Sequence, residues 1–197
     1  MLTSKGVKYT ARIGLLGAIA FVVTLVGFPL PFFPPFLKLE FSAAVSLIGG
    51  FAMGPVAGVL IELIKNVLNF LLKNDGTAGV GNLSNFIVSC AFVLPAVLVY
   101  HHKKTLKRAI AGMVIGTAAS IGVAMLSNVY LIIPAYMKVY GMDTEGLFNF
   151  LGTANKNITT LATYAFYAVA PFNLMKLAVV CGLSLLLYKR VSRPLHI

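Results

Sequence analysis

Residues 41–72 read FSAAVSLIGGFAMGPVAGVLIELIKNVLNFLL and carry only two charged side chains, those of Glu62 and Lys65. A helix needs about 20 mostly apolar residues to cross the hydrocarbon core of a bilayer, so this stretch is too long for one crossing. The pair Gly54-Pro55 divides it, because proline removes a helix hydrogen bond and clashes with the preceding turn. The stretch therefore predicts two membrane helices, over residues 42–53 and 55–73.

Four further apolar stretches flank this one, at residues 13–37, 77–100, 109–137 and 157–188. The 197-residue chain is 59% hydrophobic and 11% charged, with a mean hydropathy of +0.91. A soluble domain carries about a quarter charged residues, so a soluble globular fold is excluded. The sequence predicts an all-α integral membrane protein, forming one membrane domain over residues 1–197. Its six transmembrane helices are expected at about 10–28, 42–53, 55–73, 81–100, 107–135 and 171–189.

Charge predicts how these helices are oriented. Sixteen Lys and Arg against five acids give a net charge of +11. Ten of the basic residues form three clusters: Lys5, Lys8 and Arg12; Lys103, Lys104, Lys107 and Arg108; and Lys189, Arg190 and Arg193. Four others lie in loops of the opposite side: Lys38, Lys73, Lys138 and Lys156. Even numbers of spans separate the clusters, so the positive-inside rule places both termini in the cytoplasm. No basic face is interleaved with exposed aromatic residues, which argues against nucleic-acid binding.

Two outer loops follow from this topology. The first contains residues 28–36, FPLPFFPPF, in which prolines stiffen the chain. Its phenylalanines suit contact with lipid or a cover over a flat apolar ligand. The fifth outer loop is long, over 145–170, and residues 158–170 can form a helix within it. Pro171 then suits the first turn of the last span.

Polar side chains at membrane depth are the default place to look for function. Glu62 and Lys65 lie three residues apart and can pair, either as a structural pair or as a substrate contact. Asn82 is expected to cap the fourth span, a role that Ser84 could also take. Asn85 lies further along this helix and can face a pocket.

Two later spans carry further amides. Asn128 fits helix–helix hydrogen bonding and ligand binding equally well. Asn173 and Lys176 are three residues apart, so both point to one face in the outer half of the last span. A lysine at this depth needs an acid or a polar ligand, and the spare acid nearest the outer face is Glu40.

Catalytic patterns are missing from the sequence. It contains no Walker A motif, no G-x-S-x-G elbow and no H-E-x-x-H zinc site. Cys90 and Cys181 lie in apolar runs and provide no metal ligand set, and no catalytic residue is assigned. His101 and His102 are expected to be solvated in a basic cytoplasmic loop. The composition and motifs therefore disfavour an enzyme.

Several stretches together resemble the riboflavin-binding S components of energy-coupling-factor (ECF) transporters. These stretches are Gly27-Phe28-Pro29-Leu30-Pro31, Phe36-Leu37-Lys38-Leu39-Glu40-Phe41-Ser42, Gly49-Gly50-Phe51-Ala52-Met53-Gly54-Pro55, Ile64-Lys65-Asn66-Val67, Gly81-Asn82-Leu83-Ser84-Asn85-Phe86, Pro134-Ala135-Tyr136 and Pro171-Phe172-Asn173-Leu174-Met175-Lys176. They follow the family's order and extend over about residues 10–190. The chain departs from the family at Ala43-Ala44-Val45, where members often have Asp and then Pro. It departs again at Asn82, where members often have Glu or Gln. The first departure removes an acid near the mouth of the expected pocket.

The resemblance implies a membrane protein of six helices that captures riboflavin from outside in a pocket beneath the first outer loop. It implies that Asn128, Asn173 and Lys176 contact the ligand, and that Glu40 and its loop, with Leu39 and Phe41, form the lid. Asn85 and Tyr136, in two of the matching stretches, complete the expected site. No resident cofactor is expected, since riboflavin is the cargo. Acceptance of its phosphate, FMN, is left open.

The resemblance also implies partners in a bacterial cell membrane. S components dock on a shared transmembrane coupling subunit that carries two ATPases, and ATP hydrolysis tilts the loaded S component inward. Gly14 and Ala18 give the first span a small-residue face suited to such docking or to internal packing. Three alternative interpretations are left open: an S component for another vitamin, such as thiamine, folate or pantothenate; a membrane enzyme acting on a lipid or isoprenoid; and a structural or assembly subunit of the membrane.

Overall fold

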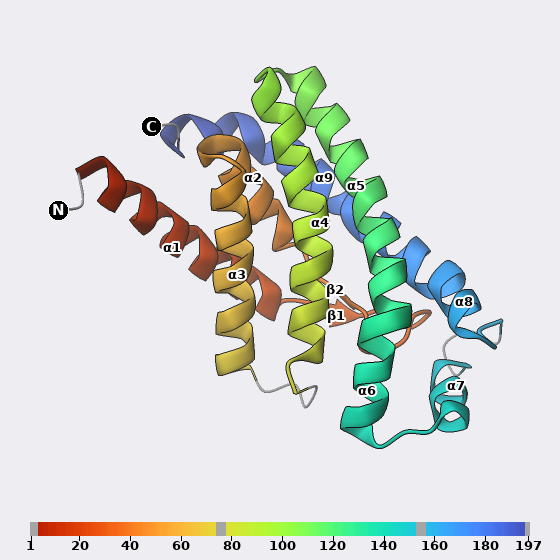
Figure 1. Cartoon of the computed structure of the whole chain (residues 1–197). Helices are drawn as coiled ribbons and strands as arrows, with labels where there is room; N and C mark the ends of the chain where they lie inside the picture. Colours follow the sequence, from red (N-terminus) through yellow and green to blue (C-terminus); the bar gives the residue numbers. More distant parts are fainter. Residues whose placement is uncertain (1–3, 74–77, 153–156, 196–197) are drawn as a thin grey trace.

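The computed structural model describes residues 4–73, 78–152 and 157–195. Its helices and strands run in the order α1 (Ser4–Leu25), β1 (Phe28–Pro29), β2 (Lys38–Leu39), α2 (Ala43–Met53), α3 (Pro55–Leu72), α4 (Val80–His102), α5 (Leu106–Ser127), the π-helical turn η1 (Asn128–Ile132), α6 (Ile133–Tyr140), α7 (Thr144–Gly152), α8 (Leu161–Tyr164), the π-helical turn η2 (Ala165–Val169) and α9 (Ala170–Leu195). Figure 1 shows α1, α3, α4, α5 and α9 as long rods around the shorter α2. The described part of the chain is mostly helical, as the sequence predicts.

Five helical segments are long and apolar enough to cross a membrane. They are Gly6–Leu25, Pro55–Leu72, Val80–His102, Leu106–Tyr140 and Leu161–Leu187. Large apolar side chains such as those of Leu15, Val114 and Leu186 are exposed on them, as expected for faces that meet lipid.

The sixth predicted span corresponds to α2, which has 11 residues and a length of about 16 Å. This is too short to cross a membrane alone. Nine of its residues are buried, and it packs against α1, α3, α4 and α9. Phe51 of α2, for example, lies with its ring centre 4.5 Å from that of Tyr100 on α4. The short helix therefore forms the centre of the bundle.

The break between α2 and α3 occurs at Gly54, as predicted. Gly54 has a φ of +108°, a conformation that residues with a Cβ rarely adopt, and Pro55 occupies the first turn of α3. Glu62 and Lys65 follow on the inner face of α3, where both are completely buried and form an ion pair. The predicted pairing is confirmed, and its burial away from lipid favours the structural interpretation.

The last membrane helix differs from its prediction. The helix expected over 158–170 is present from Leu161, but it continues through η2 into α9 and belongs to the membrane helix, whose start was expected only at Pro171. The physical reason is the π turn: the N–H of Ala170 bonds to the carbonyl of Ala165, five residues back. This wider turn ends at Val169, two residues before Pro171, and accommodates a proline that an unbroken α-helix would reject. Only α7 and the residues around it remain of the expected outer loop 145–170.

The segment between α1 and α2, residues 26–42, is called loop 1 below. Its two strands pair antiparallel, with Phe28 opposite Leu39. Within the loop, Phe33 packs edge-on against Phe172 of α9 at 5.4 Å between ring centres. Phe36 lies 5.2 Å from Tyr136 of α6 by the same measure. These aromatic contacts hold loop 1 across the ends of α6 and α9, below the centre of the bundle in Figure 1.

The two ends of the bundle differ in charge. In Figure 1 the start of α1, the connection from α4 to α5 and the end of α9 lie toward one side, and α6 and α7 lie toward the other. The first side carries exposed Lys103, Lys104, Lys107 and Arg108. The predictions for Lys5, Lys156, Lys189, Arg190 and Arg193 fall outside the residues whose side chains are described.

One expectation for the histidines is wrong. Both belong to the last turn of α4 rather than to a loop, and His101 is half-buried with its Nε2 3.1 Å from the carbonyl oxygen of Gly50. His101 therefore joins the end of α4 to α2, whereas His102 is exposed, as expected.

Candidate functional site

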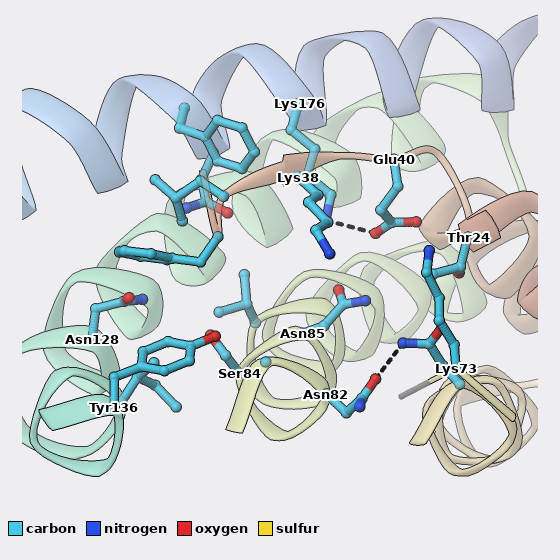
Figure 2. Close-up of a pocket in the computed structure, with 18 residues that line it drawn as sticks. Thr24, Lys38, Glu40, Lys73, Asn82, Ser84, Asn85, Asn128, Tyr136 and Lys176 are labelled. Carbon is cyan, nitrogen blue, oxygen red and sulfur yellow. Dashed lines mark hydrogen bonds and ion pairs between the residues drawn. The ribbon is translucent and has the colours of Figure 1, made fainter. Parts of the chain in front are cut away.

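A pocket opens beneath loop 1, where the ends of several helices converge. It is lined by Thr24, Phe36, Leu37, Lys38, Glu40, Asn69, Lys73, Gly81, Asn82, Ser84, Asn85, Val88, Asn128, Ile132, Tyr136, Phe172, Asn173 and Lys176. Figure 2 shows Lys176 descending from α9 at one wall, with Asn82, Ser84 and Asn85 of α4 facing it across the pocket. Apolar rings and aliphatic side chains therefore surround a set of amides and amines. Such a mixture suits a ligand that combines a flat apolar part with polar groups.

Glu40 and Lys176 form one wall through an ion pair. Lys176 Nζ lies 2.6 Å from Glu40 Oε1, and the two residues are only 7% and 4% exposed. The other carboxylate oxygen of Glu40 accepts hydrogen bonds from the backbone N–H of Ser42, at 2.8 Å, and from the Ser42 hydroxyl. The pair joins loop 1 directly to α9.

The charge state of Glu40 follows from this setting. Burial alone would raise its pKa, but the positive charges of Lys176 and Lys65 and the hydrogen bonds from Lys176 and Ser42 outweigh burial. The pKa of Glu40 is therefore held well below its ordinary value, and the carboxylate stays ionised.

Asn128 is held on one side by its own helix and on the other by Tyr164. Its Nδ2 donates to the carbonyl of Ala124 at 2.8 Å, and its Oδ1 accepts from the Tyr164 hydroxyl at 3.2 Å. These two bonds fix which way the amide faces. One N–H and one lone pair of Asn128 remain for a ligand.

Asn173 has a similar attachment on α9. Its Nδ2 donates to the carbonyl of Val169 at 2.8 Å, at the end of η2. Its other N–H and its carbonyl oxygen have no further protein hydrogen bond in the described part of the chain. Together with Lys176, three residues on, it presents donors and an acceptor from one face of α9 to the pocket, as the spacing predicts.

The capping prediction for Asn82 is wrong. The fourth membrane helix begins at Val80, and its N-cap is Gly79, a residue that has no side chain with which to cap it. Asn82 instead lies within the first turn and accepts a hydrogen bond from the side chain of Asn69 on α3. The sequence did not indicate this contact, because Asn69 and Asn82 meet only through the packing of α3 against α4.

Two lysines near the pocket have no acidic partner among the residues that the structure describes. Lys38 comes from loop 1 and Lys73 from the end of α3, and both line the pocket. In Figure 2 the amine of Lys38 lies near the middle of the pocket and Lys73 at its edge. Since Lys176 is neutralised by Glu40, these two amines make the pocket positive.

The structure brings together six of the eight predicted ligand-site residues: Glu40, Asn85, Asn128, Tyr136, Asn173 and Lys176 all line the pocket. Leu39 and Phe41 do not line it. Leu39 is buried in β2, and Phe41 packs against the hydrophobic core around α2 and α4. Thr24 and Asn69 line the pocket without having been predicted, and Tyr164 acts on it through Asn128. Phe36, one of the phenylalanines of 28–36 for which contact with lipid and cover over a ligand were both open, also lines the pocket.

Gly14 and Ala18, which form the small-residue face of α1, do not line this pocket. Among the residues that the structure describes, a methyl group added at Gly14 would meet no atom within 4 Å, and Ala18 is exposed. Gly17, by contrast, contacts Ile64 of α3. Gly14 and Ala18 therefore face away from the bundle, which removes internal packing as their explanation.

Comparison with known proteins agrees with this geometry. The family described as "ECF transporter, substrate-specific component" matches residues 8–188. The chain belongs to this family. The riboflavin transporter RibU of Staphylococcus aureus (strain TCH60) is 37% identical over 94% of this chain and 90% of its own length. The riboflavin transporter FmnP of Bacillus subtilis (strain 168) is 33% identical over 86% and 84%.

A solved structure supports the same assignment for this S component. The chain matches "Structure and mechanism of the S component of a bacterial ECF transporter" with a TM-score of 0.75 and 34% identity, over 95% of this chain and 97% of that one. The resemblance drawn from the sequence is confirmed. This S component is thus a multi-pass cell-membrane protein and the substrate-binding part of a transporter rather than an enzyme.

Proposed function

We propose that this S component captures riboflavin from outside the cell in the pocket beneath loop 1. The observation that carries the proposal is the convergence of Asn128, Asn173 and Lys176 on one aromatic-walled pocket. Similarity to riboflavin transporters over most of the chain supports the same ligand.

The chemistry of the pocket fits riboflavin. Its flat ring carries an imide edge with two carbonyls and one N–H, and its ribityl chain carries hydroxyls. Each asparagine keeps a free N–H and a free lone pair, so it can donate to a ring carbonyl and accept from the imide. Lys176 can only donate, to ring carbonyls or ribityl oxygens. Phe36, Tyr136 and Phe172 supply apolar and aromatic surface for the ring.

The topology proposed is six helices with both termini in the cytoplasm: α1, α2, α3, α4, α5 with α6, and α9. This topology is supported by the position of the basic connection from α4 to α5, which lies on the same side of the bundle as the start of α1 and the end of α9 (Figure 1). Loop 1 is then the lid over the outward-facing pocket, attached by Glu40 to Lys176.

The proposed partners are a transmembrane coupling subunit and two ATPase subunits, which would supply ATP hydrolysis. The open face of Gly14 and Ala18 supports docking, since small residues let a second helix approach closely. No resident cofactor is proposed.

Phosphorylated riboflavin (FMN) is a proposed second ligand of the same pocket. The positive charges of Lys38 and Lys73 suit a phosphate on the ribityl chain. Competition of FMN with riboflavin should weaken as ionic strength rises, because salt screens amines near the surface.

The decisive experiment is a titration of the protein, purified in mild detergent, with riboflavin and with thiamine. We expect stoichiometric quenching of flavin fluorescence and no competition by thiamine. Asn173→Ala should weaken binding by about tenfold, the effect of losing one to two hydrogen bonds. Asn149→Ala, at an exposed position of α7 outside the pocket, is the matched control. A parent protein that leaves flavin fluorescence unchanged would refute the assignment.

A further inference from the structure

A second pocket lies beside the first, on the outer side of Phe36. It is formed by loop 1, α6 and α7, and its volume is about 320 Å³. The inner pocket has a volume of only about 120 Å³. Sites for drug-sized ligands usually enclose about 300–1,000 Å³, so the inner pocket must widen before such a ligand enters, whereas the outer pocket is already large enough.

The outer pocket is lined by aromatic rings in two nearly parallel pairs. Tyr136 and Tyr140 lie 5.8 Å apart between ring centres, with 16° between their planes. Phe36 and Phe150 lie 6.3 Å apart with 22° between their planes. Tyr140 is 48% exposed and Phe150 36%, so this end of the pocket opens outward. Offset parallel rings favour another flat aromatic surface, whereas a lipid chain gains nothing from their orientation.

The two pockets share one wall. Phe36, Lys38 and Tyr136 line both of them. Two of these three belong to loop 1, and Phe36 is only half-buried. A movement of loop 1 that displaces Phe36 would therefore join the pockets, and the same movement would widen the inner one.

We propose that the outer pocket is an encounter site, where the flat ring of a flavin binds before it passes Phe36 into the inner pocket. The inference rests on the proposed function and adds a second, transient subsite to it. Lys38 on the shared wall remains a hydrogen-bond donor for the ligand during the transfer. Because the outer pocket lies on the path rather than at its end, it governs rates and leaves equilibrium affinity nearly unchanged.

Stopped-flow quenching of riboflavin fluorescence tests this inference. Tyr140→Ala and Phe150→Ala remove one ring from each pair, and neither residue lines the inner pocket. We expect association and dissociation to slow together by about fivefold, the effect of one lost aromatic pair, with Kd within twofold of the parent value. Tyr140→Phe should restore the parent rates, since it retains the ring. Tyr130→Ala is the control, because Tyr130 is 77% exposed and lines neither pocket.

The outcomes separate the two proposals. A parent protein that binds riboflavin, with both alanine variants associating at the parent rate, overturns the encounter site and leaves the proposed function intact. A Kd weakened tenfold with unchanged association also overturns it, because the outer rings would then belong to the final site. A parent protein without any quenching overturns the proposed function itself.

Discussion

Removing the negative charge of Glu40 should destabilise the protein by leaving Lys176 buried without its partner. Glu40→Gln keeps the size of the side chain and replaces the carboxylate by a neutral amide. The two groups lie 2.6 Å apart and are 4% and 7% exposed, so solvent does not take over the lost interaction. Breaking a buried ion pair by removing one partner costs about 3–5 kcal/mol, and Lys176→Met should cost a similar amount.

The double variant Glu40→Gln/Lys176→Met distinguishes an ion pair from two independent contacts. It removes both charges together, and replacing a whole buried pair is often nearly neutral. We expect the double variant to be more stable than either single one, so the coupling free energy should exceed the cost of one single substitution and be at least about 3 kcal/mol. Riboflavin binding should still fall in it, because Lys176 is also a proposed ligand contact.

Thermal unfolding in mild detergent provides the measurement. Cys90 and Cys181 are free and partly buried, so a thiol-reactive fluorophore reports their exposure on unfolding. A loss of 3 kcal/mol corresponds to a Tm lower by about 6–12 °C in a chain of this size. Glu145→Gln, at an exposed acid of α7, is the matched control and should leave Tm unchanged. Losses in the single variants that simply add in the double variant would refute the ion pair as a stabilising contact.

Three further outcomes are expected. Tyr164→Phe removes the hydroxyl that orients Asn128, so the riboflavin affinity measured by fluorescence should fall about fivefold to tenfold, while Tm changes little. An unchanged affinity would exclude this positioning role of Tyr164. The pKa of Glu40 lies below its ordinary value of 4.5, so its ion pair stabilises the fold fully above about pH 5 and less as the pH falls. When the pH is lowered below 4.5, Tm should therefore decrease more steeply in the parent protein than in Glu40→Gln. Parallel curves of Tm against pH would contradict this prediction. Gly14→Leu should leave riboflavin binding intact and abolish uptake of riboflavin into cells. The control Gly122→Leu, at an equally open helix position, should leave both binding and uptake intact. Uptake by Gly14→Leu would refute the proposed docking surface.

Composition and local sequence were sufficient for the membrane helices and for the break between α2 and α3. Both features depend only on residues that are adjacent in the sequence. A long apolar stretch is stable in lipid, and Gly54 followed by Pro55 interrupts a helix. The number of full crossings was harder, because α2 has only 11 residues and nine of them are buried, so its apolar composition fits a buried core helix as well as a crossing.

The site could be predicted where a residue carried a charge that requires a partner at membrane depth. Lys176 at membrane depth required an acid, and Glu40 was the spare one on the outer side, so their ion pair followed. Tyr164 and Asn69 carried no such signal. An aromatic residue in an apolar stretch and an amide near a helix end fit many environments. Their partners follow only from the tertiary structure, which brings Tyr164 of α8 to Asn128 of η1 and packs α3 against α4.

The π turn η2 explains why the start of the last membrane helix was predicted wrongly, and the π turn η1 accommodates a proline in the same way. Each turn ends two residues before a proline, η1 before Pro134 and η2 before Pro171. In each, a backbone N–H reaches five residues back, which removes the conflict between the proline ring and the preceding turn. Helix therefore continues through both prolines, although proline in a sequence normally indicates a helix start. The extra residue also rotates the following side chains by about 100° relative to the preceding ones. Asn128 begins the first turn and Asn173 follows the second, and the two turns contact each other. The second turn thus sets the rotation of Asn173, which we propose as a ligand contact, relative to the helix before it, and its contact with η1 places it near Asn128.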